Sequence, residues 1–203
     1  MTTQVKTKKK ISVAKMTKIA MLSVLAFVFM QLELIIPIFP QFLKLDISDL
    51  PALVGAFAMG PLAGVIIELV KNMLHLFQTS TFGVGELANF FIGSAIIVPS
   101  AMIYKKHKSR KSAIIGLAIG TVAMAIMGAI MNYFVLIPFY AAVLKFPVEA
   151  IVGMGTAVNG NITSLFTLIL LGIVPFNLLK GVVLSIITLV IYKHISPILH
   201  KGL

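Results

Sequence analysis

Long apolar runs separated by short polar segments fill most of the 203-residue chain. Several runs are about 20 residues long, the length at which a helix crosses a hydrocarbon core of about 30 Å. The pattern predicts helices over residues 13–34, 49–60, 62–77, 86–104, 113–143 and 176–195. We therefore expect an all-α membrane protein with six transmembrane helices.

Prolines and a polar loop interrupt the pattern after the first helix. Pro37 and Pro40 end that helix, because proline lacks the helical N–H and clashes with the preceding turn. In the loop that follows, residues 45–48 alternate apolar and polar side chains, as a short extended segment does. We expect Asp49 to be the N-cap of the second helix, and Gly60-Pro61 to turn the chain into the third.

A long and mostly apolar connection, residues 144–175, joins the last two predicted helices. Its segment 163–172 is apolar but too short to cross a bilayer. We expect this segment to be a helix that lies on the membrane or dips into it, rather than a seventh span. The outer connection is therefore expected to be partly helical.

The basic residues orient the predicted helices. Six of the 17 precede or begin the first helix, five lie within residues 105–111, and Lys193 and Lys201 lie near the C-terminus. Cytoplasmic segments of membrane proteins carry such an excess. We expect a basic cytoplasmic tail over residues 1–12, a single membrane domain over 13–203, and both termini in the cytoplasm. Loops 35–48, 78–85 and 144–175 then lie outside.

Composition excludes several other classes of protein. A hydrophobic fraction of 59% with 11% charged residues is far from the globular range, so we expect a multi-pass protein of the cell membrane. The net charge of +11 indicates topology and contact with the anionic lipid bilayer. The sequence lacks a basic stripe interleaved with aromatic residues, the pattern that indicates nucleic-acid binding. We therefore expect no nucleic-acid partner. Catalytic pairs, metal-ligand clusters and phosphate-binding loops are also missing, so we expect no enzyme, metal or cofactor.

Polar residues recur near the expected outer ends of four helices. Since polar groups at membrane depth are costly, they mark a pathway or a site by default. We expect them to converge in a cup open to the outside, with loop 35–48 as its lid. The candidates are Asn72, Glu86, Asn89, Asn132, Tyr133, Asn177 and Lys180, together with Leu45 and Asp46 of the loop.

Several of the polar residues also have a purely structural interpretation. Glu68 and Lys71 are three residues apart and can pair inside the bundle, and His75 can be a packing histidine. Lys180 needs partners for its charge unless it reaches the outer surface. The candidate partners are Glu86, Asn177 or a ligand carbonyl.

Five segments carry a family resemblance: LKLDISDLP at residues 43–51, GPLAG at 60–64 followed by Lys71-Asn72, GELANF at 85–90, Asn132-Tyr133, and PFNLLKG at 175–181. With these segments the chain resembles the membrane-embedded S components of energy-coupling factor (ECF) vitamin transporters. GELANF and PFNLLKG are similar to those of the riboflavin-specific type. The resemblance covers most of residues 43–181.

The resemblance implies a substrate-binding subunit of an ECF-type ABC transporter that captures riboflavin at the outer face. Riboflavin is then the transported ligand rather than a cofactor, and the partners are a T component and a pair of cytoplasmic ATPases. Asn132, Asn177 and Lys180 would hold the polar edge of the isoalloxazine ring, with Tyr133 beside them. The ribityl hydroxyls would meet Asn72, Glu86, Asn89 and the Leu45–Asp46 backbone. The alternatives are an S component for another vitamin or flavin, and a self-sufficient membrane carrier.

Overall fold

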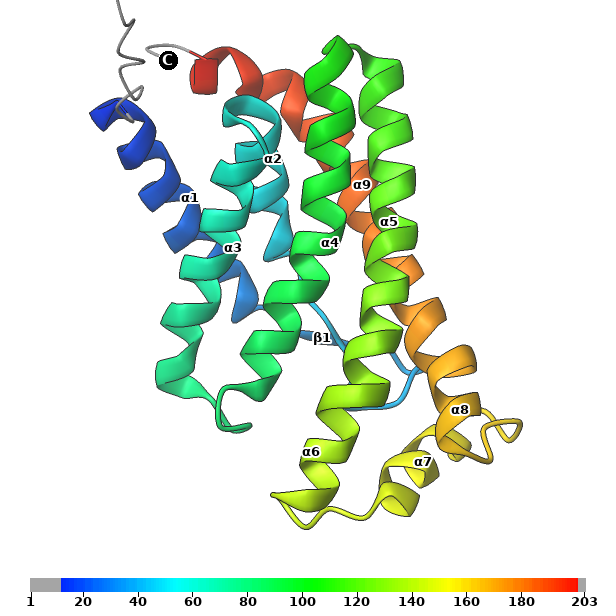
Figure 1. Ribbon diagram of the computed structural model, residues 1–203. Helices are drawn as coiled ribbons and strands as arrows, with labels where there is room; N and C mark the ends of the chain where they lie inside the picture. Colours follow the sequence, from blue (N-terminus) through cyan, green and yellow to red (C-terminus); the bar gives the residue numbers. More distant parts are fainter. Residues whose placement is uncertain (1–11, 201–203) are drawn as a thin grey trace, which may run out of the picture.

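The structure of the chain is a computed structural model that describes residues 12–200, with the side chains of residues 12–192. Residues 1–11 of the expected basic tail (residues 1–12) and the side chains of Lys193 and Lys201 lie outside this range. The described chain is a bundle of helices with one small hairpin of two strands (Figure 1). This agrees with the predicted all-α class.

The bundle contains helices of very different length. They are α1 Val13–Met30, α2 Asp49–Met59, α3 Pro61–His75, α4 Val84–His107, α5 Arg110–Met131, α6 Ile137–Ala142, α7 Val148–Thr156, α8 Leu165–Leu168 and α9 Val174–His200. A single 3₁₀ turn, Leu76–Gln78, follows α3. Within residues 12–200, four helical stretches are long and apolar enough to cross a membrane: Val13–Met30, Val84–His107, Arg110–Ala142 and Leu165–Tyr192. Helix α2 is apolar but shorter.

The first helix ends earlier than the apolar pattern predicts. Helix α1 stops at Met30, and Leu34–Ile35 form strand β1, which pairs antiparallel with strand β2, Lys44–Leu45. The predicted extension to residue 34 was therefore wrong. A helix through this point would bring the Pro37 ring against the carbonyl of Glu33. The Val28 and Phe29 carbonyls at the helix end accept the N–H groups of Gln31 and Leu32.

The start of α2 also differs from the prediction. Ser48 holds the N-cap position without a side-chain capping bond, and Asp49 is the first residue of α2 rather than its cap. Gly60 adopts φ +97°, and Pro61 opens α3. Proline suits this first position because its missing N–H has no partner in a helix. The turn predicted at Gly60-Pro61 is confirmed.

Residues 163–172 do not form a separate surface helix, so that prediction was wrong. A capping box between Ser164 and Thr167 begins α8. A π-helical turn at Ile169–Ile173 then joins α8 to α9, so Leu165–Tyr192 is one continuous stretch. A second π-helical turn, Asn132–Leu136, joins α5 to α6. The remaining connection after α6 contains α7.

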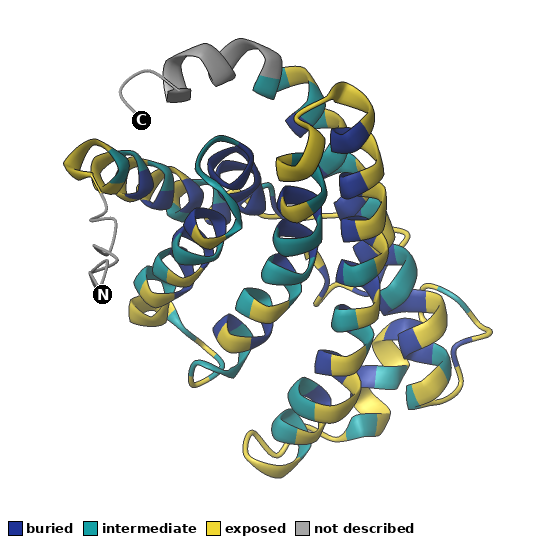
Figure 2. Cartoon of the chain, turned by 45° about the horizontal axis from the view of Figure 1, so that its top comes forward, coloured by how far each residue is buried: buried dark blue, intermediate teal, exposed yellow. Residues whose placement is uncertain are grey.

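Two apolar clusters form the core of the described residues. The larger one joins α1, α2, α3, α4, α5 and α9, and includes Leu53, Ile67, Ile96 and Leu184. The smaller one joins the loop after α1 to α6, α7, α8 and α9, and includes Phe39, Ile137, Leu168 and Phe176. Figure 2 shows the buried inner faces and exposed outer faces of the helices, and α2 is buried along nearly its whole length.

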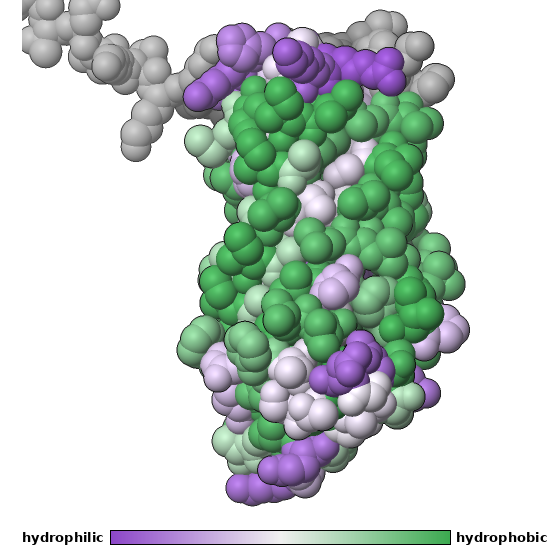
Figure 3. Space-filling model, turned by 90° about the vertical axis from the view of Figure 1, so that its right-hand side faces the viewer, coloured by the Kyte–Doolittle hydropathy of each residue, from purple (hydrophilic) through white to green (hydrophobic). Residues whose placement is uncertain are grey.

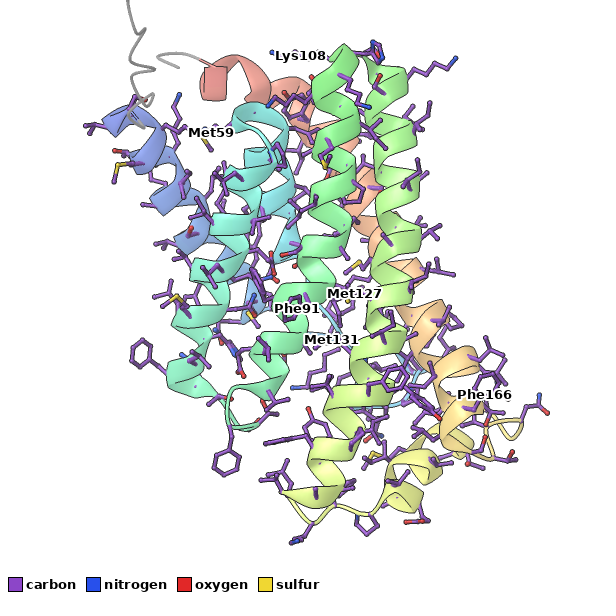
Figure 4. All side chains as sticks on the ribbon, viewed as in Figure 1. Met59, Phe91, Lys108, Met127, Met131 and Phe166 are labelled. Atoms are coloured by element: carbon purple, nitrogen blue, oxygen red, sulfur yellow. The ribbon has the colours of Figure 1, made fainter. Side chains whose placement is uncertain are left out.

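The two ends of the bundle differ in composition. The start of α1, the α2–α3 turn at Met59 and the α4–α5 turn at Lys108 lie at one end, whereas α7 and α8 lie at the other (Figures 1 and 4). Phe166 of α8 is largely exposed at that second end. Hydrophilic residues gather toward both ends, with a hydrophobic belt between them (Figure 3). This layering is the one that a bilayer requires.

A substitution at Gly64 tests the packing of α2 against α3 and α4. A Cβ at Gly64 would lie 2.6 Å from Ala56 Cβ, 2.6 Å from Ile97 Cγ2 and 2.9 Å from the Ala52 carbonyl oxygen. Overpacking of this kind costs about 1–3 kcal/mol. We therefore expect Gly64→Ala to lower the melting temperature of the purified protein.

Gly153→Ala is the matched control for Gly64→Ala. Gly153 lies in α7 with no atom within 4 Å of an added Cβ, and alanine favours a helix. Its melting temperature should equal that of the wild type or exceed it slightly. Equal melting temperatures for the two variants would contradict the packing described here.

Candidate ligand-binding site

A cavity of about 630 Å³ opens among the loop after α1 and helices α3, α4, α6, α7 and α9. Small-molecule sites typically have volumes of about 300–1,000 Å³. Its walls are mixed: apolar side chains such as Phe42, Leu136, Ile137 and Phe176 alternate with polar ones. The cavity therefore suits a ligand that has both an apolar body and hydrogen-bonding groups.

Six of the nine predicted site residues line this cavity: Asp46, Glu86, Asn89, Asn132, Asn177 and Lys180. They come from the loop and from α4, the π-helical turn after α5, and α9. All except Asn89 are buried. The structure thus brings together residues that are up to 134 positions apart in the sequence.

The other three predicted residues do not line the cavity. Leu45 packs on the smaller apolar cluster, and Asn72 donates its side-chain amide to Glu68. Tyr133 is 38% exposed, with its ring against Phe134. Tyr133 therefore lies outside the cavity wall to which its neighbour Asn132 belongs.

Lys71 lies at the centre of a buried charge network behind the cavity. Its ammonium Nζ pairs with Asp49 Oδ1 at 2.7 Å and with the carboxylate of Glu68. It also donates to Ser48 Oγ at 3.0 Å and to Asn89 Oδ1 at 3.2 Å. The predicted pair between Glu68 and Lys71 is confirmed. Full burial of this cation is possible because several acceptors surround it.

Lys180 extends the same network to the cavity wall. Its Nζ lies 2.8 Å from Asp46 Oδ2 and 3.2 Å from Asp49 Oδ2. Predicting Glu86 or Asn177 as its partners was wrong, because the loop and the first turn of α2 bring the two aspartates against α9. The Lys180 side chain does not reach the outer surface, since it is buried. Asp49 therefore bridges two lysines, a role that the sequence analysis missed.

A local signal could have pointed to Asp49. It follows Asp46 by three residues at the start of an apolar helix, and two lysines occur inside other apolar helices. Cations inside an apolar bundle require nearby anions. Counting acidic and basic residues at membrane depth would therefore have favoured an ion-pair role for Asp49 over a capping role.

Asp46 fastens the loop after α1 to the bundle. Its Oδ1 accepts the backbone N–H of Ser48 at 2.9 Å, while its Oδ2 pairs with Lys180. Nearby, the exposed side chains of Lys44 and Glu33 pair across the loop. Since Phe42, Leu43, Lys44 and Asp46 all line the cavity, this loop forms one of its walls.

Glu86 is held by three side chains at the end of α3 and in the turn that follows. His75 Nδ1 lies 2.8 Å from Glu86 Oε1. Thr79 and Thr81 donate their hydroxyls to Oε2 at 2.9 and 3.3 Å. This arrangement explains why Glu86 does not pair with Lys180. His75 thus has a polar partner and also lines the cavity.

The two cavity asparagines use their amide nitrogens in the same way. Asn132 Nδ2 donates to the carbonyl of Gly128 at 2.8 Å, and Asn177 Nδ2 donates to the carbonyl of Ile173 at 2.9 Å. A side-chain amide has two donors on nitrogen and an acceptor oxygen. With one nitrogen donor bound to the helix, each amide retains its Oδ1 as an acceptor for a ligand.

The fold and this cavity define a helical membrane protein with a cavity of small-ligand size near one end of its bundle. The family model for the substrate-specific component of ECF transporters matches residues 14–192. The chain therefore belongs to this family.

Several known proteins are similar to the chain over most of its length. The riboflavin transporter RibU of Staphylococcus aureus is 37% identical over 92% of this chain and 93% of that protein. The riboflavin transporter FmnP of Bacillus subtilis is 37% identical over 91% and 93%. A solved structure of the S component of a bacterial ECF transporter has a TM-score of 0.72 and 37% identity, covering 92% of this chain and 98% of that chain.

Replacing Lys71 by methionine tests the energetic weight of the network. Lys71→Met would leave the carboxylates of Asp49 and Glu68 buried without their shared cation. Removing one partner of a buried pair costs about 3–5 kcal/mol. We expect a large fall in melting temperature.

Lys44→Met is the matched control, because its pair with Glu33 is 40–47% exposed. Exposed pairs contribute about 0–1 kcal/mol, so the melting temperature should change little. If Lys71→Met and Lys44→Met had the same melting temperature, the network would not be the stabilising element described above.

Proposed function

We propose that this chain captures riboflavin at the outer face of the cell membrane, as the substrate-binding subunit of an ECF transporter. One observation carries the proposal: Asn132, Asn177 and Lys180 meet on the wall of a single cavity of suitable volume. The similarity to riboflavin transporters of two bacteria supports it independently.

The polar groups of this wall complement the imide edge of a flavin, which presents C=O, N–H and C=O. An ammonium has three N–H donors. Lys180 donates one of them to Asp46 Oδ2, and its charge also pairs with Asp49 Oδ2 at 3.2 Å. A remaining N–H can donate to a flavin carbonyl. The Oδ1 atoms of Asn132 and Asn177 are acceptors for the imide N–H. Aromatic and aliphatic side chains of the cavity can pack the ring faces.

The ribityl hydroxyls suit the other polar residues that line the cavity. Glu86 and Asn89 of α4 and Asp46 of the loop offer carboxylate and amide oxygens, which accept hydrogen bonds from neutral hydroxyls. The backbone of Leu45–Asp46 is a further expected contact. We leave the side chains of Leu45, Asn72 and Tyr133 out of the proposed site because they do not line the cavity.

The proposed topology has six membrane segments, with α2 and α3 as the two short ones. The start of α1, the Gly60-Pro61 turn and the basic 105–111 turn lie at the same end of the bundle. An excess of lysine and arginine favours the cytoplasmic side, so we assign this end and both termini to the cytoplasm. The cavity then faces outward beneath the loop after α1.

The proposed partners are a T component and a pair of cytoplasmic ATPases. Family membership supports this assembly. The role of the chain would be to select the vitamin, and ATP hydrolysis by the partners would drive its uptake. A carrier that works without partners is the alternative, and uptake by cells expressing this chain alone would favour it.

Titration of the purified protein with riboflavin tests the proposed ligand. A flavin enclosed among polar and aromatic side chains should lose fluorescence, and we expect saturation at submicromolar concentration. Other vitamins, such as thiamine and biotin, should neither bind nor compete. Unchanged flavin fluorescence up to micromolar ligand and protein would reject riboflavin as the substrate.

Two neighbouring residues test the proposed site. Asn132→Ala removes a group of the cavity wall, and losing such a hydrogen bond costs roughly 1–3 kcal/mol, or about 5- to 150-fold in affinity. Tyr133→Ala removes a larger side chain that does not line the cavity, so the affinity of this variant should stay within about 3-fold of the wild type. The reverse order of effects would contradict the proposed site.

A further inference from the structure

Gly128 of α5 lies between the two cavity asparagines without lining the cavity itself. Its carbonyl oxygen accepts the Asn132 amide at 2.8 Å. Its Cα faces Asn177 of α9: a Cβ added there would lie 2.6 Å from Asn177 Nδ2 and 2.9 Å from Asn177 Cγ. Real Cβ atoms essentially never approach this closely. Asn177 can occupy its place only because residue 128 has no side chain.

The helix geometry around Gly128 supports a role in the site. The π-helical turn after α5 begins at Asn132, and the one before α9 ends at Ile173, whose carbonyl accepts the Asn177 amide. Such π-helical turns are rare and often occur at functional sites. Each amide is thereby held to a main-chain carbonyl of its own helix, and its orientation is set before any ligand arrives.

Other glycines of α5 serve a different purpose. Added Cβ atoms at Gly116 and Gly120 would meet Ser100 and Ile96 of α4. Neither of these two residues lines the cavity. Gly116 and Gly120 therefore permit close packing between α4 and α5, whereas Gly128 makes room for a residue of the site.

We propose that Gly128 is a positioning residue of the ligand site. It fixes Asn132 through its carbonyl and Asn177 through its missing side chain, so that both amide oxygens are available to the imide edge of the ligand. This inference rests on the proposed function for its ligand. Gly128 itself lies outside the cavity wall.

Gly128→Ala tests the inference, with Gly120→Ala as the matched control in the same helix. The added methyl at position 128 must displace Asn177, so we expect riboflavin affinity to fall at least about 10-fold. Gly120→Ala should lower the melting temperature while its affinity stays within about 3-fold. Wild-type affinity in Gly128→Ala would overturn the inference.

A double-mutant cycle separates positioning from general packing. In the Asn177→Ala background the displaced amide is gone, so Gly128→Ala should cause little further loss of affinity and little further loss of thermal stability. If Gly128→Ala lowered the affinity by the same factor in both backgrounds, the inference would be overturned, because the methyl would then act elsewhere.

Nuclear magnetic resonance of protein labelled with ¹⁵N-asparagine gives a readout that needs no ligand. Gly128→Ala should shift the side-chain amide signals of Asn177, which the added methyl meets, and Gly120→Ala should leave them unchanged. Unmoved signals in Gly128→Ala would overturn the positioning role whatever the ligand. If the wild type fails to bind riboflavin while these signals do shift, the proposed function fails and the positioning role stands.

Discussion

The carboxylate of Asp49 lies between two buried lysines, and the arrangement of the bundle depends on this contact. Lys71 reaches it from α3 and Lys180 from α9, while Asp49 itself opens α2. A buried ammonium is costly unless it is paired and hydrogen-bonded. The three helices must therefore adopt positions that satisfy both cations at once. Asp46 adds the loop after α1 to the same constraint.

The network that stabilises the fold also shapes the cavity. Asn89 accepts a hydrogen bond from Lys71 and lines the cavity, and Lys180 pairs with two aspartates while facing the ligand space. A ligand that contacts either residue acts on the charge network directly. Such a ligand binds the folded state, so it should also stabilise the protein against unfolding. Selection of a ligand and stability of the bundle are physically linked in this chain.

The sequence predicted how far along its helix each polar residue lies better than it predicted which way the residue faces. Polar residues near the ends of apolar runs were enough to place Glu86, Asn132 and Lys180 at one level. Rotation decides which of Asn132 and Tyr133 faces inward, and the apolar pattern around them is too uniform to reveal it. Pairing between Asp46 and Lys180 spans 134 positions, so no local rule could predict it. The last helix was predicted to begin at residue 176, but the π-helical turn at Ile169–Ile173 joins it to α8.

The structure of the purified protein with bound riboflavin would test the central claim most directly. The account predicts that the imide edge of the flavin contacts Asn132, Asn177 and Lys180, while Lys180 keeps its pairs with Asp46 and Asp49. A flavin bound outside this cavity, or a Lys180 side chain turned away from both aspartates and the ligand, would contradict it.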